Sequence, residues 1–385
     1  MPLWSRTSWT LLGTSALSGL GSLPLHLLPF LVAVAIAGGV LSPAMAGWIG
    51  AAYMVGLLVT SSLLPLWRVE HLSRAQAAVA AALLVGALLL AAEQAGMVLV
   101  LLDWLLVGVS CGVLQVMGAM AAARTEHRRE AFALRLAVTL AIAGAATAAL
   151  QLMGAFASYE ALTHGLALLT GTTAAFALLL PMPRLHVGVV RPAPIAGRGV
   201  KWQGLVFIGL FFVGQHGLWA YTVEGAIGNG IDLSMTAVNI SLCKFAACAA
   251  LMTHNFGLSR RWPDRTLRPG GFALAVSAGI VVATSDSALL LLGLLVWQVL
   301  LNTMSARFQA EIVSADPLNA GAWITAAIFI GSALGYVLRG AAIAMGVDWA
   351  FQAFIVFSCF LPALWKWREE GRTRVAEEVK LAGST

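Results

Sequence analysis

One lysine lies in the middle of an otherwise apolar stretch. Lys244 is about eleven residues into Ser234–His254, which at about 1.5 Å of rise per residue places it roughly 15 Å from either surface of a membrane. A lysine at that depth must be neutral, paired or hydrated. It could anchor an anionic substrate such as a carboxylate, act as a proton-linked switch, form an internal ion pair, or extend toward the surface. Its mid-span depth disfavours the last of these.

Polar side chains in four other apolar stretches fall on single helical faces. They are Gln298, Asn302, Ser305 and Gln309; Ser15, Ser18, Ser22 and His26; Gln215, Trp219 and Thr222, with His216 alongside; and Ser332, Tyr336 and Arg339. Polar groups inside a bilayer usually face a cavity or another helix, and spacings of three, four and seven residues align them on one face. The alternative is hydrogen bonding between helices without a water-filled path.

Eight side chains form the predicted substrate-binding set. They are His26, Gln215, His216, Trp219, Lys244, Gln298, Asn302 and Tyr336. Cationic and amide groups could hold an anion through charge and hydrogen bonds. Aromatic rings could stack on a flat substrate, although packing and interfacial belts explain membrane aromatics equally well.

Two residues are predicted to carry a coupling proton. Asp103 lies about two turns into the fourth apolar stretch and could accept a proton there, or it could pair with a cation such as Arg339. His216 is the second candidate, because imidazole titrates near neutral pH. Arg307 and Glu311 are four residues apart, which predicts a salt bridge or an inner gate contact.

Two glycine motifs are interpreted as packing motifs. Gly108–Gly112 matches the GxSxG pattern of serine hydrolases, but that motif needs a strand-to-helix turn and here it lies within an apolar helix. Gly331–Gly335 is likewise a GxxxG packing pattern. The sequence has no Walker loop and no His, Cys and carboxylate cluster with metal-site spacing. We therefore expect no enzyme, no cofactor and no metal.

The composition is that of a membrane protein. The chain is 60% hydrophobic and 10% charged, whereas a soluble domain carries about 25% charge, so the net charge of +6 does not indicate a nucleic-acid partner. Hydropathy predicts an all-α fold with about twelve transmembrane helices. They are Trp9–Ile36, Ser42–Leu66, Ala75–Ala92, Met97–Ala122, Ala131–Met153, Tyr159–Leu180, Gly204–Ala226, Ser234–His254, Gly270–Thr284, Ala288–Val313, Gly321–Met345 and Trp349–Trp365.

Lys and Arg gather in alternate connections between these stretches. The opposite connections contain no Lys or Arg and hold Glu93, Glu160, Asp232, Asp286 and Asp348. On the basic side only the short connection 314–320 lacks a basic residue. The positive-inside rule predicts that the basic side and both termini are cytoplasmic.

The two halves of the chain match in layout. Ser42 and Ser234 open corresponding stretches 192 residues apart, and Arg68 and Arg260 follow with the same offset. This spacing predicts two parallel six-helix repeats. The expected organisation is an N-terminal six-helix bundle at 1–180, a cytoplasmic basic linker at 181–203, a C-terminal six-helix bundle at 204–366 and a cytoplasmic tail at 367–385.

This layout resembles the major facilitator superfamily of transporters over essentially the whole chain. The start of the second span, Leu41–Gly50, is similar to the family's usual sequence there. The family's best-known motif follows that span, and in the corresponding stretch of this chain only Glu70 and Arg74 match it in kind. The resemblance implies alternating access, with spans one, four, seven and ten lining the central path and spans three, six, nine and twelve facing lipid.

The function expected from these features is proton-coupled secondary active transport of a small organic anion. Aromatic anions are among the expected substrates. The alternative within transport is efflux of lipophilic compounds by a proton antiporter. Two further alternatives are a polytopic membrane enzyme, for which no nucleophile or metal constellation is present, and a non-transporting receptor. The expected partners are the substrate, protons and membrane lipids. The protein is expected to be a monomer in the cell inner membrane.

Overall fold

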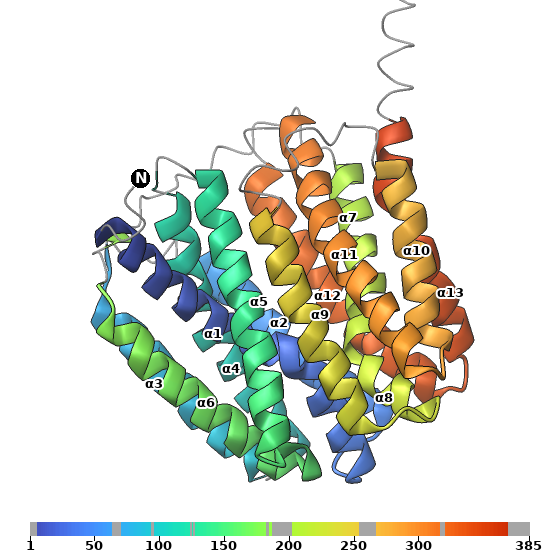
Figure 1. Ribbon diagram of the computed structural model, residues 1–385, viewed down its shortest axis with the longest axis horizontal. Helices are drawn as coiled ribbons and strands as arrows, with labels where there is room; N and C mark the ends of the chain where they lie inside the picture. The colour runs from blue at the N-terminus through green and yellow to red at the C-terminus, as the bar shows by residue number, and fades with distance from the viewer. Residues whose placement is uncertain are drawn as a thin grey trace, which may run out of the picture.

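The computed structural model describes residues 6–63, 71–93, 96–123, 125, 128–181, 185–186, 202–253, 267–315 and 320–368. This part of the chain is almost entirely helical (Figure 1). The helices are α1 (Arg6–Ala37), α2 (Pro43–Leu63), α3 (Arg74–Ala92), α4 (Met97–Ala123), α5 (Arg128–Leu152), α6 (Tyr159–Leu179), α7 (Trp202–Ala220), α8 (Thr222–Gly228), α9 (Leu233–Thr253), α10 (Leu267–Ala283), α11 (Ser287–Ala315), α12 (Ala320–Ala344) and α13 (Asp348–Ser358). A 3-10 turn, η1, spans Ala155–Ala157.

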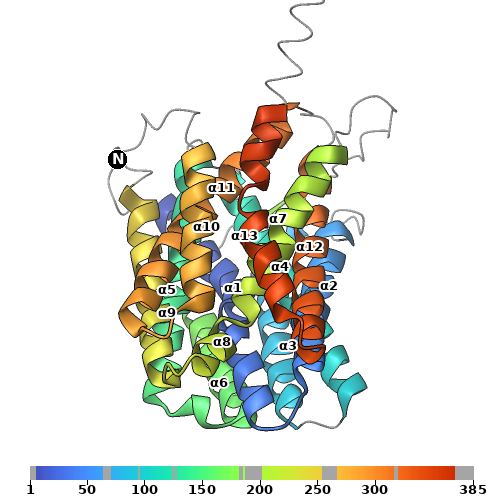
Figure 2. The same cartoon turned by 90° about the vertical axis from the view of Figure 1, so that its right-hand side faces the viewer.

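Ten of these helices are long and apolar enough to cross a membrane. An eleventh span is obtained if α13 is joined to the following helix Leu361–Arg368, from which it is bent by 44° (Figure 2). The apolar segment Pro269–Ala283 of α10 is shorter than 18 residues. The structure therefore supports an all-helical, multi-span protein, with ten or eleven candidate spans in the described ranges in place of the twelve expected.

Two expected spans are not continuous helices. The expected span Gly204–Ala226 breaks at Tyr221, which has φ −110° and ψ 17° between α7 and α8. The Thr222 hydroxyl donates to the Leu218 carbonyl at 2.8 Å, so that this carbonyl has a partner at the break. The last expected span bends after Ser358. Hydropathy averages over such breaks and does not detect them.

Most short connections on the acidic side turn on a left-handed glycine. Every positive-φ glycine in the described ranges lies there, namely Gly39, Gly96, Gly154, Gly230 and Gly346. A residue with a Cβ adopts this conformation only at a cost, whereas glycine does not. These residues allow the chain to reverse between long helices within a few positions.

Aspartates in the acidic connections cap the two helices that carry Lys244 and Gln298. The Asp232 carboxylate accepts the backbone N–H of Ser234 at 2.9 Å, at the start of α9. Hydrogen bonds from the Ser234 hydroxyl and from nearby backbone amides hold the pKa of Asp232 below its usual range. The Asp286 carboxylate accepts the N–H of Leu289 at 2.8 Å, at the start of α11. These caps fix where α9 and α11 begin, and therefore the level of Lys244 and Gln298.

Four helices lie at the periphery of the bundle. In Figure 1, α3 and α6 form the left edge and α10 and α13 the right edge, and Figure 2 views the latter pair face-on. They expose large apolar side chains, among them Leu90, Phe176, Phe272 and Phe357. Such a surface suits a helix that faces lipid.

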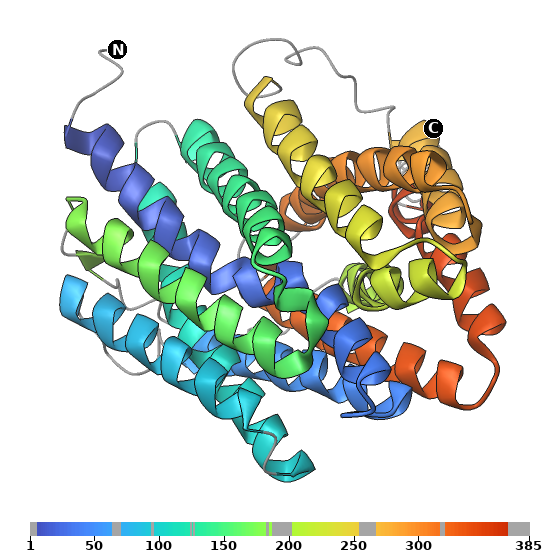
Figure 3. The same cartoon turned by 60° about the horizontal axis from the view of Figure 1, so that its bottom comes forward.

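The first six helices contact the later ones mainly through two pairs. Helix α2 packs against α12, and α5 packs against α9, as Figure 3 shows for α5 and α9. Four hydrogen bonds across this boundary join Gln151 to Ser234, Gly144 to Ser241, Leu25 to Trp219 and Pro43 to Tyr221. All of them lie in the half of the helices nearer the acidic connections.

A two-stranded pair was not predicted from the sequence. Strand β1 (His71–Leu72) pairs antiparallel with β2 (Leu185–His186). The Arg74 guanidinium also donates to the Leu180 carbonyl at 2.8 Å. Most of the expected basic linker, and nearly all of the expected tail, lie outside the described residues.

The two glycine motifs are confirmed as packing motifs. A Cβ at Gly108 would contact the Tyr53 carbonyl, and one at Gly112 would contact the Thr60 side chain at 2.6 Å. A Cβ at Gly331 or Gly335 would contact the carbonyl of Gly209 or Val213 of α7. Helix backbones therefore touch at these positions, and a serine-nucleophile turn at Gly108–Gly112 is excluded by the continuous helix α4.

A Gly335→Ala substitution is expected to destabilise the protein by about 1–3 kcal/mol, because the new methyl group must push α7 and α12 apart. The control is Gly279→Ala in α10, where a Cβ would meet nothing within 4 Å. That variant should gain stability by up to about 1 kcal/mol from helix propensity. Thermal unfolding in detergent measures both, and shifts of the same sign and size would contradict the packing argument.

Candidate functional site

Lys244 is buried at the centre of a polar and aromatic cluster. Its side chain, in the middle of α9, is 1% exposed. The ammonium donates to Gln298 Oε1 of α11 at 3.0 Å and lies 3.9 Å from the centroid of the Trp219 ring of α7. No carboxylate pairs with it in the described part of the chain. The lysine is therefore held by an amide and a ring face rather than by an ion pair.

Trp219 connects this cluster to α1. Its indole N–H donates to the Leu25 carbonyl at 2.9 Å. Pro29, four residues after Leu25, lies inside α1 and has no N–H to offer that carbonyl. The proline thus frees the acceptor that Trp219 uses. The Trp219 ring also stacks with Trp297 of α11, with centroids 5.8 Å apart and planes 14° apart.

Gln215 is fully engaged in hydrogen bonds within the later helices. Its amide nitrogen donates to Ser358 at 2.9 Å and approaches the Cys359 sulfur at 3.3 Å, while its oxygen accepts the Trp297 indole N–H at 2.8 Å. Hydrogen bonding between helices, without a water-filled path, was the alternative interpretation of the polar side chains. It applies to Gln215. Gln215 therefore positions Trp297 and offers no free amide group to a substrate in this conformation.

His216 and Tyr336 form a second aromatic pair beside the cluster. Their rings are parallel within 5°, with centroids 5.7 Å apart, and the Tyr336 hydroxyl lies 3.4 Å from His216 Nδ1. Both His216 and His26 of α1 lie near enough to interact electrostatically with Lys244. Three nitrogen-bearing side chains from α1, α7 and α9 thus surround one region, with no acid among their described partners.

The polar face of α11 continues away from Lys244 toward the basic side. The Asn302 amide donates to the Gln298 carbonyl at 2.7 Å, and Gln309 donates to the Ser305 hydroxyl at 3.0 Å. Asn302 and Gln309 are partly exposed. The stripe predicted from spacing is therefore present as one continuous face of a single helix.

Asp103 does not join this cluster. It is partly exposed on α4, next to Trp104, whose indole N–H donates to the Tyr159 hydroxyl at 2.9 Å. The predicted alternative, a pair with Arg339, is wrong. Arg339 instead contacts Asp348 through Nε at 3.2 Å and through Nη2 at 3.3 Å.

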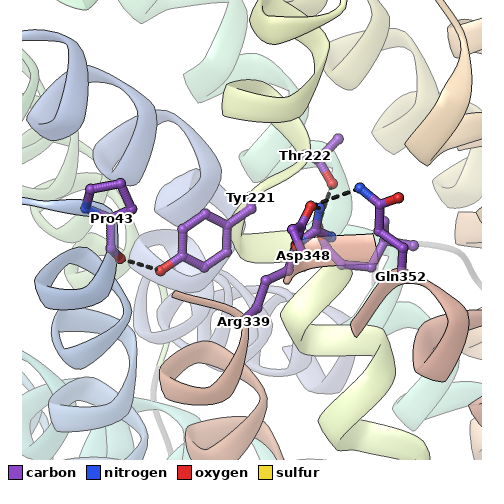
Figure 4. A network of polar contacts seen from close by, with 7 residues as sticks. Pro43, Tyr221, Thr222, Arg339, Asp348 and Gln352 are labelled. Carbon is purple, nitrogen blue, oxygen red and sulfur yellow. Dashed lines mark hydrogen bonds and ion pairs between the residues drawn. The ribbon is translucent and has the colours of Figure 1, made fainter. Parts of the chain in front are cut away.

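The Arg339–Asp348 pair belongs to a network on the acidic side (Figure 4). Asp348 also accepts the Gln352 amide at 2.7 Å. The Arg339 guanidinium lies 5.9 Å from the Tyr221 ring centroid, and the Tyr221 hydroxyl donates to the Pro43 carbonyl at the start of α2 at 2.8 Å. Residues of α12 and α13 therefore support a tyrosine that joins α2 to the later helices.

Sequence comparisons find no matching family model and no matching curated protein. Solved structures do match. One is a point mutant of the nucleoside transporter NupG, with 15% identity and a TM-score of 0.70 over 92% of this chain and 99% of that chain. The human organic anion transporter MFSD10 follows, with 14% identity and a TM-score of 0.62 over 92% and 98%. The chain has the fold of the major facilitator transporters.

A third match is the xylose transporter XylE from E. coli in a partially occluded inward-open conformation. It shares 12% identity with this chain and has a TM-score of 0.66 over 94% of this chain and 96% of that chain. These solved structures are transporters rather than enzymes. Because the identities are low, the likeness identifies the major facilitator fold and a multi-pass membrane protein, while the substrate has to be argued from the site.

Within this major facilitator fold, the expected gate residues Arg307 and Glu311 have side chains outside the described residues. Two further side chains were not predicted from the sequence. Tyr221 is not among the predicted substrate-binding residues, although its hydroxyl joins α2 to the later helices. Arg135 of α5 lies inside an apolar span, and the criterion that selected Lys244 would have found it.

Trp219→Phe should leave an aromatic ring beside Lys244 and remove only the indole N–H. We expect a loss of about 1 kcal/mol of stability, the usual net value of one buried hydrogen bond. Trp349→Phe is the matched control, because that side chain is 71% exposed and should not change stability. Thermal unfolding in detergent measures both variants, and equal shifts would show that the Leu25 bond is not stabilising.

Proposed function

We propose that the protein is a secondary active transporter of a small organic anion, coupled to protons. The observation that carries this proposal is Lys244, a buried cation with no acidic partner among the described residues. Gln298 and Trp219 orient its ammonium, and His26 and His216 lie in the same region. Positive and neutral hydrogen-bonding groups without a carboxylate suit an oxyanion. The likeness to the organic anion transporter MFSD10 agrees with this class of substrate.

The proposed machinery is alternating access between two six-helix halves, 1–180 and 204–366. In this assignment α7 with α8 is one broken span, α10 is a short span, and α13 with Leu361–Arg368 is one bent span, which gives twelve. Four hydrogen bonds between the halves lie on the acidic side. With the basic side in the cytoplasm, the conformation is inward-facing, and the membrane is the cell inner membrane.

His216 is the coupling residue that this arrangement favours. It lies within electrostatic range of Lys244 and against Tyr336, so its charge state affects both the site and α12. Asp103 has no such link in the described residues. A proton on His216 and an anion beside Lys244 neutralise each other, which would favour binding them together. The protein is proposed to work as a monomer.

Uptake into proteoliposomes tests this proposal. Purified protein is reconstituted, and aliphatic and aromatic carboxylates are supplied with and without an inward-directed proton gradient. We expect at least one carboxylate to accumulate faster with the gradient, and to stop when the gradient is collapsed by an ionophore. Movement of lipophilic cations alone would favour the efflux alternative and overturn the anion proposal. Protein-free liposomes are the control.

A further inference from the structure

A second cationic side chain lies inside the membrane-spanning part of the protein. Arg135 lies in the candidate span Glu130–Leu152, seven residues from the basic-side end of α5, or about 10 Å. Its Nε donates to the Ser18 hydroxyl of α1 at 2.7 Å. No acidic side chain pairs with it in the described ranges. Arginine inside a membrane is costly, so an uncompensated one indicates a function.

Ser15 belongs to the same place. Helices α1 and α5 lie side by side (Figures 1 and 3), and a Cβ at Gly19 would lie 3.3 Å from the Thr139 Cα. Ser15 lies one turn before Gly19 on α1, and Arg135 lies one turn before Thr139 on α5, so the two residues are at the same level. The Ser15 hydroxyl is buried and has no hydrogen-bond partner. A guanidinium and two hydroxyls, one of them unused, therefore lie together between α1 and α5.

This group lies between Lys244 and the basic side. The Ser241 hydroxyl donates to the Gly144 carbonyl at 2.9 Å, which aligns α9 with α5. Lys244 is three residues nearer the basic side than Ser241, and Arg135 is nine residues nearer that side than Gly144. The difference of six residues is about 9 Å along the helices. Ser18 also shares the polar face of α1 with His26, which interacts with Lys244.

We propose that Arg135, Ser15 and Ser18 form a second oxyanion-binding site, which holds the carboxylate of the transported anion on its way between Lys244 and the basic side. A guanidinium presents paired N–H donors that match two carboxylate oxygens, and a serine hydroxyl donates a third bond. A lipid phosphate is the other source of an oxyanion. The test below is made without lipid, so that a lipid phosphate cannot occupy the site. The identity of the ligand rests on the proposed function, but the site can be tested without transport.

The test is the reactivity of a cysteine placed on the face of α1 that carries Ser15 and Ser18. Ser22 is partly exposed and one turn from Ser18 on the same face, about 6 Å along α1. Ser22→Cys is built with Cys248→Ala, because the other native cysteines are buried. In non-ionic detergent without lipid, the thiol reacts with sulfonatoethyl or with trimethylammonioethyl methanethiosulfonate. The ratio of the two rates cancels any effect of Arg135 on the thiol itself.

The anionic reagent should react roughly tenfold or more faster than the cationic one, relative to their rates with a free thiol. Adding Arg135→Gln should lower that ratio severalfold, although the charge of Lys244, which lies near the level of Ser22, keeps it above the free-thiol value, and Arg135→Lys should retain most of it. A ratio unchanged by Arg135→Gln, or no reaction with either reagent in a monodisperse protein, would overturn the second site. Failure of the uptake experiment would instead overturn the organic-anion proposal and leave this result standing.

Discussion

Replacing Lys244 by methionine is expected to lower kcat/KM for uptake of the transported anion by about 10- to 150-fold. Methionine keeps the length and apolar character of the side chain and removes the charge. A charge-assisted hydrogen bond contributes about 1.5–3 kcal/mol, which corresponds to that range. The ring of Trp219 and the amide of Gln298 would remain, so the variant should still fold.

Two companion variants make the result specific to charge at this position. Lys244→Arg keeps the charge and should retain measurable uptake, although the larger planar group fits the same space less well. Lys366→Met makes the same exchange in Leu361–Arg368, at the end of the described chain, and should leave uptake near wild type. Wild-type uptake in Lys244→Met, at equal reconstituted protein, would remove Lys244 from the binding site.

Asp348→Asn is expected to destabilise the protein by about 2 kcal/mol, because it leaves the Arg339 guanidinium buried without its counter-charge. Arg339 is 3% exposed, and its Nη1 atom already lacks a partner. The Asp348 side chain is 26% exposed, which keeps the expected loss below that of a fully buried pair. Glu224 is in electrostatic range of Arg339 and offsets part of the loss.

A double-mutant cycle separates the ion pair from other effects of this change. Arg339→Met combined with Asp348→Asn removes both charges and should be more stable than Asp348→Asn alone. Thermal unfolding in detergent gives the four stabilities. If the single and double variants are equally destabilised, the pair does not support the Tyr221 region as argued from Figure 4.

Much of the fold was predictable because membrane solvation constrains it strongly. A bilayer requires long apolar helices, so hydropathy located most spans to within a few residues, as for α3 and α6. The resemblance to major facilitator transporters is confirmed at the level of the fold. The break at Tyr221 and the bend after Ser358 were not predicted, because each depends on a few local hydrogen bonds that average hydropathy does not register.

The candidate site was predictable where helical spacing alone decides which side chains share a face. The α11 stripe and the burial of Lys244 follow from one helix each. Partners on different helices could not be predicted, since these require the packing angles. Gln215 therefore looked available although it bonds Ser358 and Trp297, and Arg339 was considered as an alternative partner of Asp103 although it contacts Asp348. Pro29 explains the Trp219 contact only once α1 and α7 are seen together.

The most direct test of the central claim is whether the protein binds a negatively charged substrate more tightly than a neutral analogue. Affinities of the purified protein are measured by calorimetry for the transported carboxylate and for its neutral amide, in wild type and in Lys244→Met. The account predicts that wild type prefers the carboxylate by about tenfold or more, and that the preference disappears in Lys244→Met. An equal preference in both proteins would contradict recognition of an anion by Lys244.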